Sequence, residues 1–445
     1  MRSVRLRVAE GRRPMVVSAE MGYGHLRAAV PVAAALDTPV VLADREPLAS
    51  PGDRRVWDGV RRLHELSSRG SELPLVGPPM RRLLDAATSI PPLHPLRNLA
   101  DPTAATLALE RLVDRGFGDG LVRALRADDR PLLTTFYAPA VVADLAGLRE
   151  IYCIVTDADV NRVWVPRRPR SSAIRYLVPT RRVMQRLRAY GVPEANVTFT
   201  GFPLPLSLLG DEHLDVLRAD LAQRLVRLDP HGSFRDQCRH ELSHFFPGLP
   251  ATRRGPAPRL TFAVGGAGAQ ARIIDAALPG LRAAIEGGRL CLTLVAGTRR
   301  EVQQRFVRSL QRHRLGHQLG RAVEIVYEPD HHAYFEAFEQ LLRRTDVLWT
   351  KPSELTFYAA LGLPLVLTDP VGAHERFNRR WIREQGVGLE QRDPRFLAGR
   401  LREWLHDGTL AAAAWSGFVR LPKLGTLRIL EEIGTARPSC PRARP

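Results

Sequence analysis

Residues 14–36 constrain the fold of this chain more than any other stretch. An apolar run at residues 15–17 predicts a short buried strand, and Gly22 and Gly24 predict a tight turn after it. A helix is expected to open at His25, because apolar residues then recur at helical spacing. A strand, a glycine turn and a helix start together present backbone N–H groups and one side chain at the edge of a parallel sheet. That side chain is a histidine, which can carry a proton near neutral pH, so the stretch predicts chemistry at that edge.

The length and composition are those of a two-domain globular protein. The chain has 445 residues, of which 44% are hydrophobic and 25% are charged, and these values are ordinary for globular domains. It holds no run of about 18 apolar residues, so no membrane span is expected. The basic N-terminus lacks the apolar segment of a signal peptide. These features predict a cytoplasmic location, either free or peripheral at the inner face of the membrane.

The strong positive charge does not by itself indicate a nucleic-acid partner. The net charge is +18, and all but two of the 65 basic residues are arginines. Such a skew is typical of GC-rich codon usage, and the arginines are spread along the chain instead of gathered in a basic arm. We therefore expect no nucleic-acid binding, while contact with an anionic substrate or an anionic lipid stays open.

Short apolar strands alternate with helical segments, which predicts α/β domains built on mainly parallel sheets. The predicted strands lie at residues 14–18, 39–43, 131–135, 151–155, 174–178, 197–200, 259–264, 290–296, 322–327, 346–349 and 364–368. Residues 70–103 are expected to form a long loop or lid, and residues 205–258 interrupt the pattern with polar helices. The expected organisation is a first α/β domain at 1–205, a helical insertion at 206–257, a second α/β domain at 258–434 and a disordered tail at 435–445.

A second glycine-rich turn follows the predicted strand that ends at residue 264. Gly265, Gly266 and Gly268 free the backbone, and Gln270 precedes the next predicted helix. A helix N-terminus with unpaired N–H donors suits a diphosphate. The pattern is shorter than the full dinucleotide fingerprint, so an ordinary tight turn between strand and helix remains an open alternative.

A polar segment follows the predicted strand at residues 346–349. Lys351 is expected to face a phosphate, and Glu354 or Glu375 to accept hydrogen bonds from ribose or sugar hydroxyls. Polar loops after two neighbouring strands form a site at the carboxyl edge of a sheet. Ordinary capping of these loops is the alternative interpretation.

Several motifs, taken in order, resemble glycosyltransferase family 28, which comprises diacylglycerol glycosyltransferases and the peptidoglycan N-acetylglucosaminyltransferase. The matching segments are Ser18-Ala-Glu-Met-Gly-Tyr-Gly-His-Leu-Arg-Ala-Ala29, Thr156-Asp-x-x-x-Asn-x-x-Trp164, Val197-Thr-Phe-Thr-Gly-Phe-Pro203, Thr350-Lys-Pro with Gly362-Leu-Pro364, and Glu375-x-x-Asn378. The likeness covers about residues 14–205 and 258–430. It implies a GT-B fold, in which two Rossmann-like domains with mainly parallel sheets face each other across a cleft.

The resemblance also implies roles for individual residues. His25 would be the catalytic base beside the acceptor hydroxyl, and Asp157 would join it in the catalytic group by orienting its neighbours or the acceptor. Gly22, Gly24, Asn161 and Trp164 would lie on the acceptor side. The donor-binding residues would be Gly265, Gly266, Gly268, Gln270, Thr350, Lys351, Ser353, Glu354, His374, Glu375 and Asn378.

Three positions depart from the family pattern. Asn161 stands where the lipid enzymes carry a histidine, and Phe357 stands where the donor-site helix carries a glutamate. Ala373 and His374 replace the Gly-Gln pair that precedes the family's glutamate. We expect Glu354 to substitute for the missing glutamate from the loop. These departures leave the identity of the donor open.

A literal zinc-protease motif is also present, at residues 240–244. His240 and His244 would share one face of a helix, as zinc requires. No third ligand is evident, and the motif lies in the predicted insertion, so no metal site is expected.

The sequence therefore predicts an inverting, metal-independent glycosyltransferase that uses a nucleotide-diphosphate sugar such as a UDP-sugar. The acceptor would be a lipid at the membrane surface or a small molecule, and no cofactor is expected beyond the nucleotide-sugar substrate. Two alternatives stay open. One is a nucleotide-sugar 2-epimerase, which shares this architecture, and the other is a non-catalytic GT-B ligand-binding protein.

Overall fold

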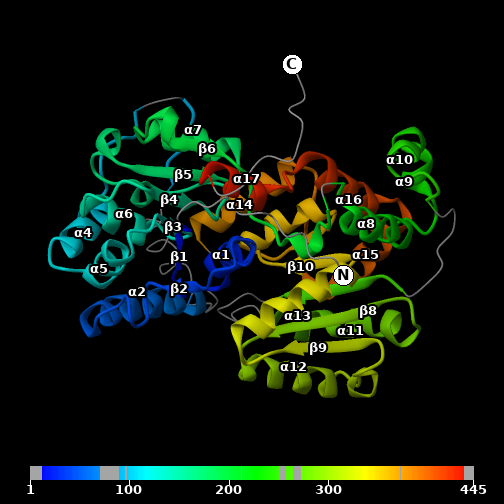
Figure 1. Ribbon diagram of the computed structural model, residues 1–445. Coiled ribbons are helices and arrows are strands. Elements are labelled where there is room, and N and C mark those ends of the chain that lie inside the picture. Colours follow the sequence, from blue (N-terminus) through cyan, green and yellow to red (C-terminus); the bar gives the residue numbers. More distant parts are fainter. Residues whose placement is uncertain are drawn as a thin grey trace. The chain divides into compact units, whose positions relative to one another are not determined.

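A computed structural model describes residues 13–70, 90–95, 98–211, 213–249, 257–263, 272–370 and 372–434 (Figure 1). Contacts divide the chain into two compact units. Unit 1 contains the described residues up to Leu206, the segment Gly372–Phe377 and the described residues from Pro422 onward. Unit 2 contains the described residues of Ser207–Val371 and Asn378–Leu421. The predicted loop at 71–89 and 96–97, the tail at 435–445, and Gly265, Gly266, Gly268 and Gln270 lie outside the described residues.

Unit 1 is built on a six-stranded parallel sheet in the order β2-β1-β3-β4-β5-β6. Its strands are β1 (Met15–Ser18), β2 (Val40–Leu42), β3 (Leu132–Thr134), β4 (Ile151–Ile154), β5 (Ile174–Val178) and β6 (Val197–Phe199). Its helices are α1 (Tyr23–Leu36), α2 (Pro51–Gly70), α4 (Ala104–Val113), α5 (Asp119–Asp128), α6 (Tyr137–Leu145), η1 (Arg162–Trp164), η2 (Pro169–Ser171), α7 (Arg181–Ala189), η3 (Glu194–Asn196) and α17 (Gly425–Glu432).

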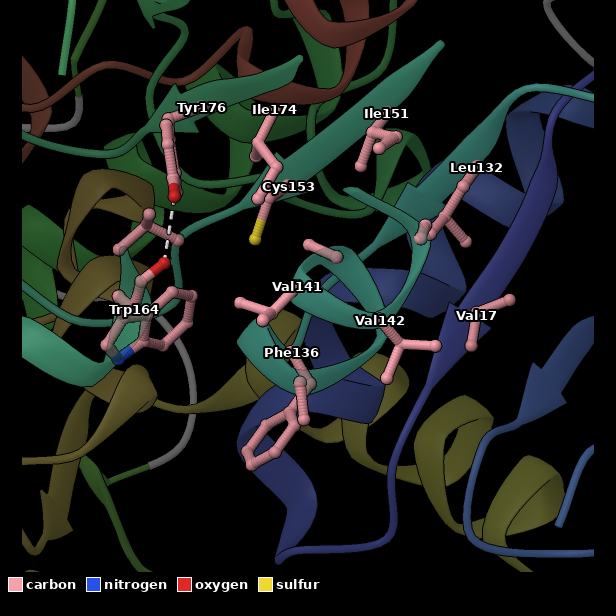
Figure 2. Packing of buried hydrophobic residues seen from close by; sticks show 14 of the residues in the cluster. Val17, Leu132, Phe136, Val141, Val142, Ile151, Cys153, Trp164, Ile174 and Tyr176 are labelled. Carbon is pink, nitrogen blue, oxygen red and sulfur yellow. Dashed lines mark hydrogen bonds between the residues drawn. The ribbon is translucent and has the colours of Figure 1, made fainter. Parts of the chain in front are cut away.

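The core of unit 1 forms because its central strands β1, β3, β4 and β5 are buried at every position except Arg175, and most of their residues are apolar. Strands covered by helices on both faces lack the apolar-polar alternation of half-exposed strands. Figure 2 shows Leu132, Ile151 and Ile174 from neighbouring strands facing Val141 and Val142 of α6. All five side chains are buried.

Unit 2 is built on a second six-stranded parallel sheet in the order β12-β11-β10-β7-β8-β9. Its strands are β7 (Arg259–Ala263), β8 (Cys291–Gly297), β9 (Val323–Tyr327), β10 (Val347–Thr350), β11 (Leu365–Leu367) and β12 (Gly388–Glu390). Its helices are α8 (Asp215–Leu228), α9 (Ser233–Gln237), α10 (Arg239–Phe245), α11 (Ile273–Glu286), α12 (Arg300–Arg312), η6 (Gly316–Gln318), α13 (His331–Arg344), η7 (Glu354–Leu361), η8 (Pro394–Phe396), α15 (Leu397–His406) and α16 (Thr409–Arg420). Both η4 (Leu206–Leu208) and α14 (Ala373–Glu384) contain residues of each unit.

The strand order of unit 2 is that of dinucleotide-binding Rossmann domains. Counted within the unit, β9-β8-β7-β10-β11-β12 is the order 3-2-1-4-5-6. The chain therefore folds into two Rossmann-like α/β domains on parallel sheets, as a GT-B protein has, and this predicted fold class is confirmed. The prediction that the two sheets face each other across a cleft stays a prediction.

A buried arginine ties α8 to the core of unit 2. The guanidinium of Arg224 donates to the carbonyls of Leu342 and Thr345 at the end of α13, and to that of Leu361 at the end of η7. The carbonyl of Leu342 also accepts from the N–H of Thr345, and the arginine serves as a shared C-cap for the ends of both helices. Burial lowers the pKa of Arg224 to about 10, a value at which the side chain stays charged at neutral pH.

Every predicted strand is present, and two local features differ from the prediction. The sequence does not predict β12, because Gly388–Glu390 holds a single large apolar residue. The helix predicted to open at His25 begins at Tyr23 instead, so Gly24 lies inside α1 and not in the turn. Within the part of the chain that the structure describes, no helix is long and apolar enough to cross a membrane.

Candidate active site

His25 lies in the first turn of α1, directly beyond the carboxyl end of β1. Gly22 caps the helix with φ 105° and ψ 176°. That positive φ favours glycine, because a Cβ at this position would strain the backbone. The glycine therefore allows the chain to turn from β1 into α1 within five residues and to hold His25 at the edge of the sheet.

The hydrogen bonds of His25 determine which of its ring nitrogens carries the proton. Its Nδ1 lies 2.7 Å from the carbonyl oxygen of Thr135 and 3.3 Å from the hydroxyl of Thr156. A carbonyl can only accept, so Nδ1 carries the hydrogen and donates it. In the neutral ring Nε2 then holds the lone pair, which is the arrangement that a general base needs.

Aromatic side chains surround this imidazole. The ring of Phe136 meets it edge-on at a centroid distance of 4.7 Å, and the ring of Trp164 lies at 6.4 Å. Tyr137 packs against both aromatic rings, at 4.5 Å and 5.5 Å. Burial raises the pKa of Tyr137 to about 12, which keeps its phenol neutral at physiological pH. These three aromatic side chains form an apolar surface beside His25, which is partly buried.

The topology makes this corner of unit 1 the expected ligand-binding position. The chain leaves β1 toward β2 on one side and leaves β3 toward β4 on the other side, so the switch point lies between β1 and β3. The register pairs Val17 with Thr134, and the hydroxyl of Thr135 donates to that of Ser18 over 2.9 Å. In open α/β sheets, ligands bind outside the carboxyl ends of the strands at this point.

The connection from β4 to β5 supplies the other side of the site. Asp159 is fully buried and accepts from the guanidinium groups of Arg186, over 2.8 and 3.0 Å, and Arg182, over 2.7 Å. The hydroxyls of Thr180 and Tyr190 donate to the carbonyls of Ala158 and Val160. Side chains of α7 and its flanking residues therefore hold the backbone that carries the acceptor-side residues.

The predicted acceptor-side residues of this connection differ in their surroundings. The hydroxyl of Tyr176 donates to the carbonyl of Trp164 over 2.8 Å, as Figure 2 shows. Asn161 precedes η1, and its Oδ1 is buried with no hydrogen-bond partner among the described residues. Asp157 is half-buried in the same connection. The carboxylate held by the two arginines is thus Asp159, two residues after the predicted Asp157.

In unit 2 the corresponding switch point lies between β7 and β10. Thr350 ends β10, and its hydroxyl donates to the carbonyl of Ala263 at the end of β7 over 3.0 Å. Lys351 follows and is half-buried, and Glu354 is the first residue of η7. Ser353 caps η7 and is 7% exposed, yet its hydroxyl has no hydrogen-bond partner among the described residues. A buried hydroxyl without a partner costs about 1–3 kcal/mol, so a ligand oxygen here would relieve that cost.

The remaining predicted donor-site residues lie on or near α14 and η7. Phe357 is buried against Trp381 at a ring distance of 4.9 Å, so the position where the family carries a glutamate is a core position here. Glu375 is 1% exposed and Asn378 fully buried, while His374 is half-buried. His374 and Glu375 group with unit 1 and Asn378 with unit 2. Whether they share a site with Lys351 stays a prediction.

Sequence reasoning missed Thr135, Phe136 and Tyr137. Two threonines and two aromatic residues follow a buried strand here, which could have indicated an edge site. Nothing in the local sequence indicates that β3 lies next to β1, because 113 residues separate the two strands. That adjacency is a property of the tertiary fold.

The zinc-protease motif lies on α10, a helix of seven residues. His240 is exposed there, and His244 packs edge-on against Phe245 at 5.3 Å. Across the described ranges, no group of three or more His, Cys, Asp or Glu residues is arranged to hold a metal ion.

Comparison with known proteins gives one partial family match and a set of similar folds. Residues 312–395 match a family described as a domain of unknown function (DUF6938). No curated protein matches the sequence. A putative UDP-N-acetylglucosamine 2-epimerase from Listeria monocytogenes is 12% identical with a TM-score of 0.49, covering 94% of this chain and 96% of its own.

Two glycosyltransferase structures are similar to the same extent. The glycosyltransferase of kitacinnamycin is 16% identical with a TM-score of 0.48, covering 96% of this chain and all of its own. The spinosyn rhamnosyltransferase SpnG, complexed with thymidine diphosphate, is 14% identical with a TM-score of 0.45, covering 94% of this chain and all of its own.

Proposed function

We propose that this protein is a glycosyltransferase that moves a sugar from a nucleotide diphosphate to an acceptor hydroxyl, with inversion at the anomeric carbon. The observation that carries the proposal is the Rossmann strand order of unit 2 together with the polar groups at its switch point. Lys351, the unpartnered hydroxyl of Ser353 and the N–H groups that open η7 are suited to the oxygens of a diphosphate.

Unit 1 supplies the acid–base group of this proposal. With Nδ1 donating to Thr135, Nε2 of His25 accepts the proton of the acceptor hydroxyl. The acceptor oxygen then bonds to the anomeric carbon while the bond from that carbon to the diphosphate oxygen breaks. The diphosphate leaves with the bonding electron pair, and the donors around Lys351 stabilise its growing charge. The protein's own cationic and N–H groups supply this stabilisation, so the proposed reaction needs no metal ion.

The aromatic group around His25 favours an acceptor with apolar surface beside its reacting hydroxyl. Phe136, Tyr137 and Trp164 offer ring faces and edges to such an acceptor. A lipid at the membrane surface and an apolar small molecule both meet this requirement, and the proposal includes both.

A panel of nucleotides and nucleotide sugars tests the proposal. UDP, GDP and dTDP are added at millimolar concentration, and thermal unfolding is followed for each. We expect one of them to raise the midpoint, because a ligand at 100 times its Kd stabilises the native state by about 2.7 kcal/mol. Stabilisation by none of the three would contradict the proposal.

Mass spectrometry of the products then separates transfer from its alternatives. Transfer requires an acceptor and yields a glycoside together with the free nucleotide diphosphate. A donor that is epimerised or hydrolysed at full rate without any acceptor would instead indicate the 2-epimerase alternative. Nucleotide binding without any turnover across the panel would indicate a ligand-binding protein.

A further inference from the structure

A cavity of about 360 Å³ opens in unit 1 away from the candidate active site. Its walls are the loop that joins α6 to β4, the segment that leads into β5, and Glu110 on α4. Both connecting segments precede a strand, so the cavity lies at the amino-terminal edge of the parallel sheet. His25 and its partners lie at the opposite, carboxyl-terminal edge.

Three exposed arginines line this cavity: Arg149 from the first loop, and Arg167 and Arg168 from the second. Among the described residues, no carboxylate forms a salt bridge with Arg167 or Arg168. The positive charge of Arg149 favours the ionised form of the neighbouring Asp144 carboxyl. Exposed arginines in the wall of one cavity can bind an oxyanion, each with two parallel N–H donors, and Arg167 and Arg168 form no salt bridge with a described carboxylate that would compete.

The two carboxylates in the cavity wall are already engaged by backbone donors. Glu110 accepts from the N–H of Arg167 over 2.6 Å, and Asp144 accepts from the N–H of Ala173 over 2.8 Å. Burial raises the pKa of Asp144, while the hydrogen bonds from Ala173 and Ser172 and the charge of Arg149 oppose the shift. The carboxylates therefore hold the loops in place, and the guanidinium groups remain available to a ligand.

The size of the cavity favours a small molecule over an extended polymer. Its volume is at the lower end of that of ligand pockets, and Leu145, Leu148 and Pro166 add apolar wall beside the arginines. We propose that this cavity binds the phosphate group of a phosphorylated small molecule. The site is separate from the proposed transfer reaction and does not depend on it.

Isothermal titration of the full-length protein with inorganic pyrophosphate tests the proposal. Arg149→Gln combined with Arg168→Gln is expected to weaken binding by at least about 100-fold, because the double variant removes two charge-assisted pairs. Arg115→Gln is the matched control, because Arg115 is exposed on the same unit and does not line the cavity. It is expected to change the affinity less than twofold.

A second variant distinguishes this site from the proposed donor site, which could also hold pyrophosphate. Lys351→Met is expected to abolish UDP binding and to leave the cavity's pyrophosphate binding intact. Loss of pyrophosphate binding in Lys351→Met with retention in the double arginine variant would overturn the proposal. Equal weakening by Arg115→Gln, or no pyrophosphate binding at all, would overturn it as well.

A vesicle-binding experiment distinguishes a soluble ligand from a lipid, because a phospholipid headgroup also carries a phosphate group. We expect phosphatidic-acid vesicles to bind no more tightly to the wild type than to the double arginine variant. Vesicle binding that requires Arg149 and Arg168, without binding of soluble pyrophosphate, would show that the source is a lipid and would contradict a small-molecule site.

Discussion

At His25 a single backbone carbonyl determines the chemistry of the side chain. The oxygen of Thr135 can only accept, so it holds the hydrogen on Nδ1 and leaves the Nε2 lone pair to the other side of the ring. The hydroxyl of Thr156 shares the same hydrogen at 3.3 Å. The imidazole is thereby oriented by two groups that lie 110 and 131 residues away in the chain.

Replacing His25 by Ala is expected to lower turnover by about 10²–10⁴, the contribution of a positioned general base. Nucleotide binding should be retained, because the proposed donor groups are in unit 2. Turnover is measured with the donor that the nucleotide panel identifies, and binding by titration with the same nucleotide. His240→Gln is the control, since His240 is exposed on α10.

If His25→Ala keeps wild-type turnover, the role of this side chain as base is wrong. If His240→Gln loses turnover instead, the rejected histidine motif at residues 240–244 takes part in the reaction.

Lys423 provides a residue-scale prediction about stability and pH. Burial lowers the pKa of its amine to about 8, from 10.5 in an unfolded chain. Between pH 8 and 10.5 the unfolded state therefore binds more protons than the native state, so stability rises with pH across this window and is level below it. Lys423→Met should remove this slope and, at pH 7, stabilise the protein by on the order of 2–3 kcal/mol.

Chemical denaturation of the wild type and Lys423→Met at pH 7 and pH 10 measures both effects. If the free energy of unfolding of the wild type falls as pH rises from 8 to 10, and that of the variant falls in the same way, the buried-amine explanation is contradicted.

At the scale of elements, the β4–β5 connection contains no α-helix, and side chains from outside it hold its backbone in place. Asp159 and the carbonyls of Ala158 and Val160 are all bound by side chains of α7 and its flanking residues. Asp159→Asn leaves two guanidinium groups facing a neutral amide, one of them fully buried. Removing one partner of a buried ion pair costs about 3–5 kcal/mol.

We therefore expect Asp159→Asn to lower the free energy of unfolding by about 3 kcal/mol. Asp128→Asn serves as the control, because Asp128 is exposed and its contact with Arg130 spans 3.8 Å. An exposed pair of this kind contributes about 0–1 kcal/mol. Equal losses for the two variants in urea denaturation would show that the buried network adds nothing to stability.

The packing of α16 against η7 gives a second prediction at this scale. A Cβ at Gly417 of α16 would lie 2.3 Å from the carbonyl oxygen of Ala359, a contact that real side chains do not show. Gly417→Ala must displace η7, which follows directly after Ser353 of the proposed diphosphate site. We expect it to lower stability and to weaken nucleotide binding together.

The matched control is Gly399→Ala in α15, where the added Cβ meets nothing within 4 Å. Alanine is a better helix former than glycine by about 1 kcal/mol, so this change should stabilise the protein slightly. Thermal unfolding with and without nucleotide compares the two variants. Wild-type nucleotide affinity in Gly417→Ala would contradict a role of η7 in binding.

At the scale of the whole molecule, two sheets of different strand order divide the proposed reaction between them. Unit 1 has its switch point between β1 and β3, and unit 2 between β7 and β10. Both points place the carboxyl ends of two central strands beside polar residues. A nucleotide is therefore expected to bind unit 2, where the strand order is that of dinucleotide-binding domains.

Hydrogen exchange of the full-length protein with and without UDP tests this division. We expect slower exchange in peptides that cover residues 347–361 and unchanged exchange in peptides that cover residues 15–36. Protection confined to the second set would place the nucleotide in unit 1 and would contradict the division of roles.

Much of the fold follows from local sequence patterns. Each predicted strand is a largely apolar run of four to seven residues, and the structure places a strand at each. The edge strand β12 is missed because it has almost no apolar pattern. The start of α1 is misplaced by two residues because Gly24 indicates a turn, although in the structure it lies within the helix.

The candidate site is predicted less completely than the fold, because its parts come from distant segments. The sequence identifies His25, Trp164, Lys351 and Ser353 as candidates from their motifs. It selects Asp157, whose role stays a prediction, and it does not indicate Asp159, the carboxylate that two arginines hold. Asp157 and Asp159 lie two residues apart in the same connection but have different neighbours. Only the tertiary packing of α7 shows which of the two meets the arginines.

The sequence by itself determined the α/β class, the positions of the central strands and the histidine that follows the first glycine turn. Those features depend on residues within about ten positions of one another, so periodicity and turn chemistry suffice to indicate them. Only the tertiary structure decided that β3 lies beside β1 and β7 beside β10, and hence where each switch point lies. The tautomer of His25 and the unpartnered hydroxyl of Ser353 also depend on the tertiary structure, because each is defined by which atoms of distant segments meet it.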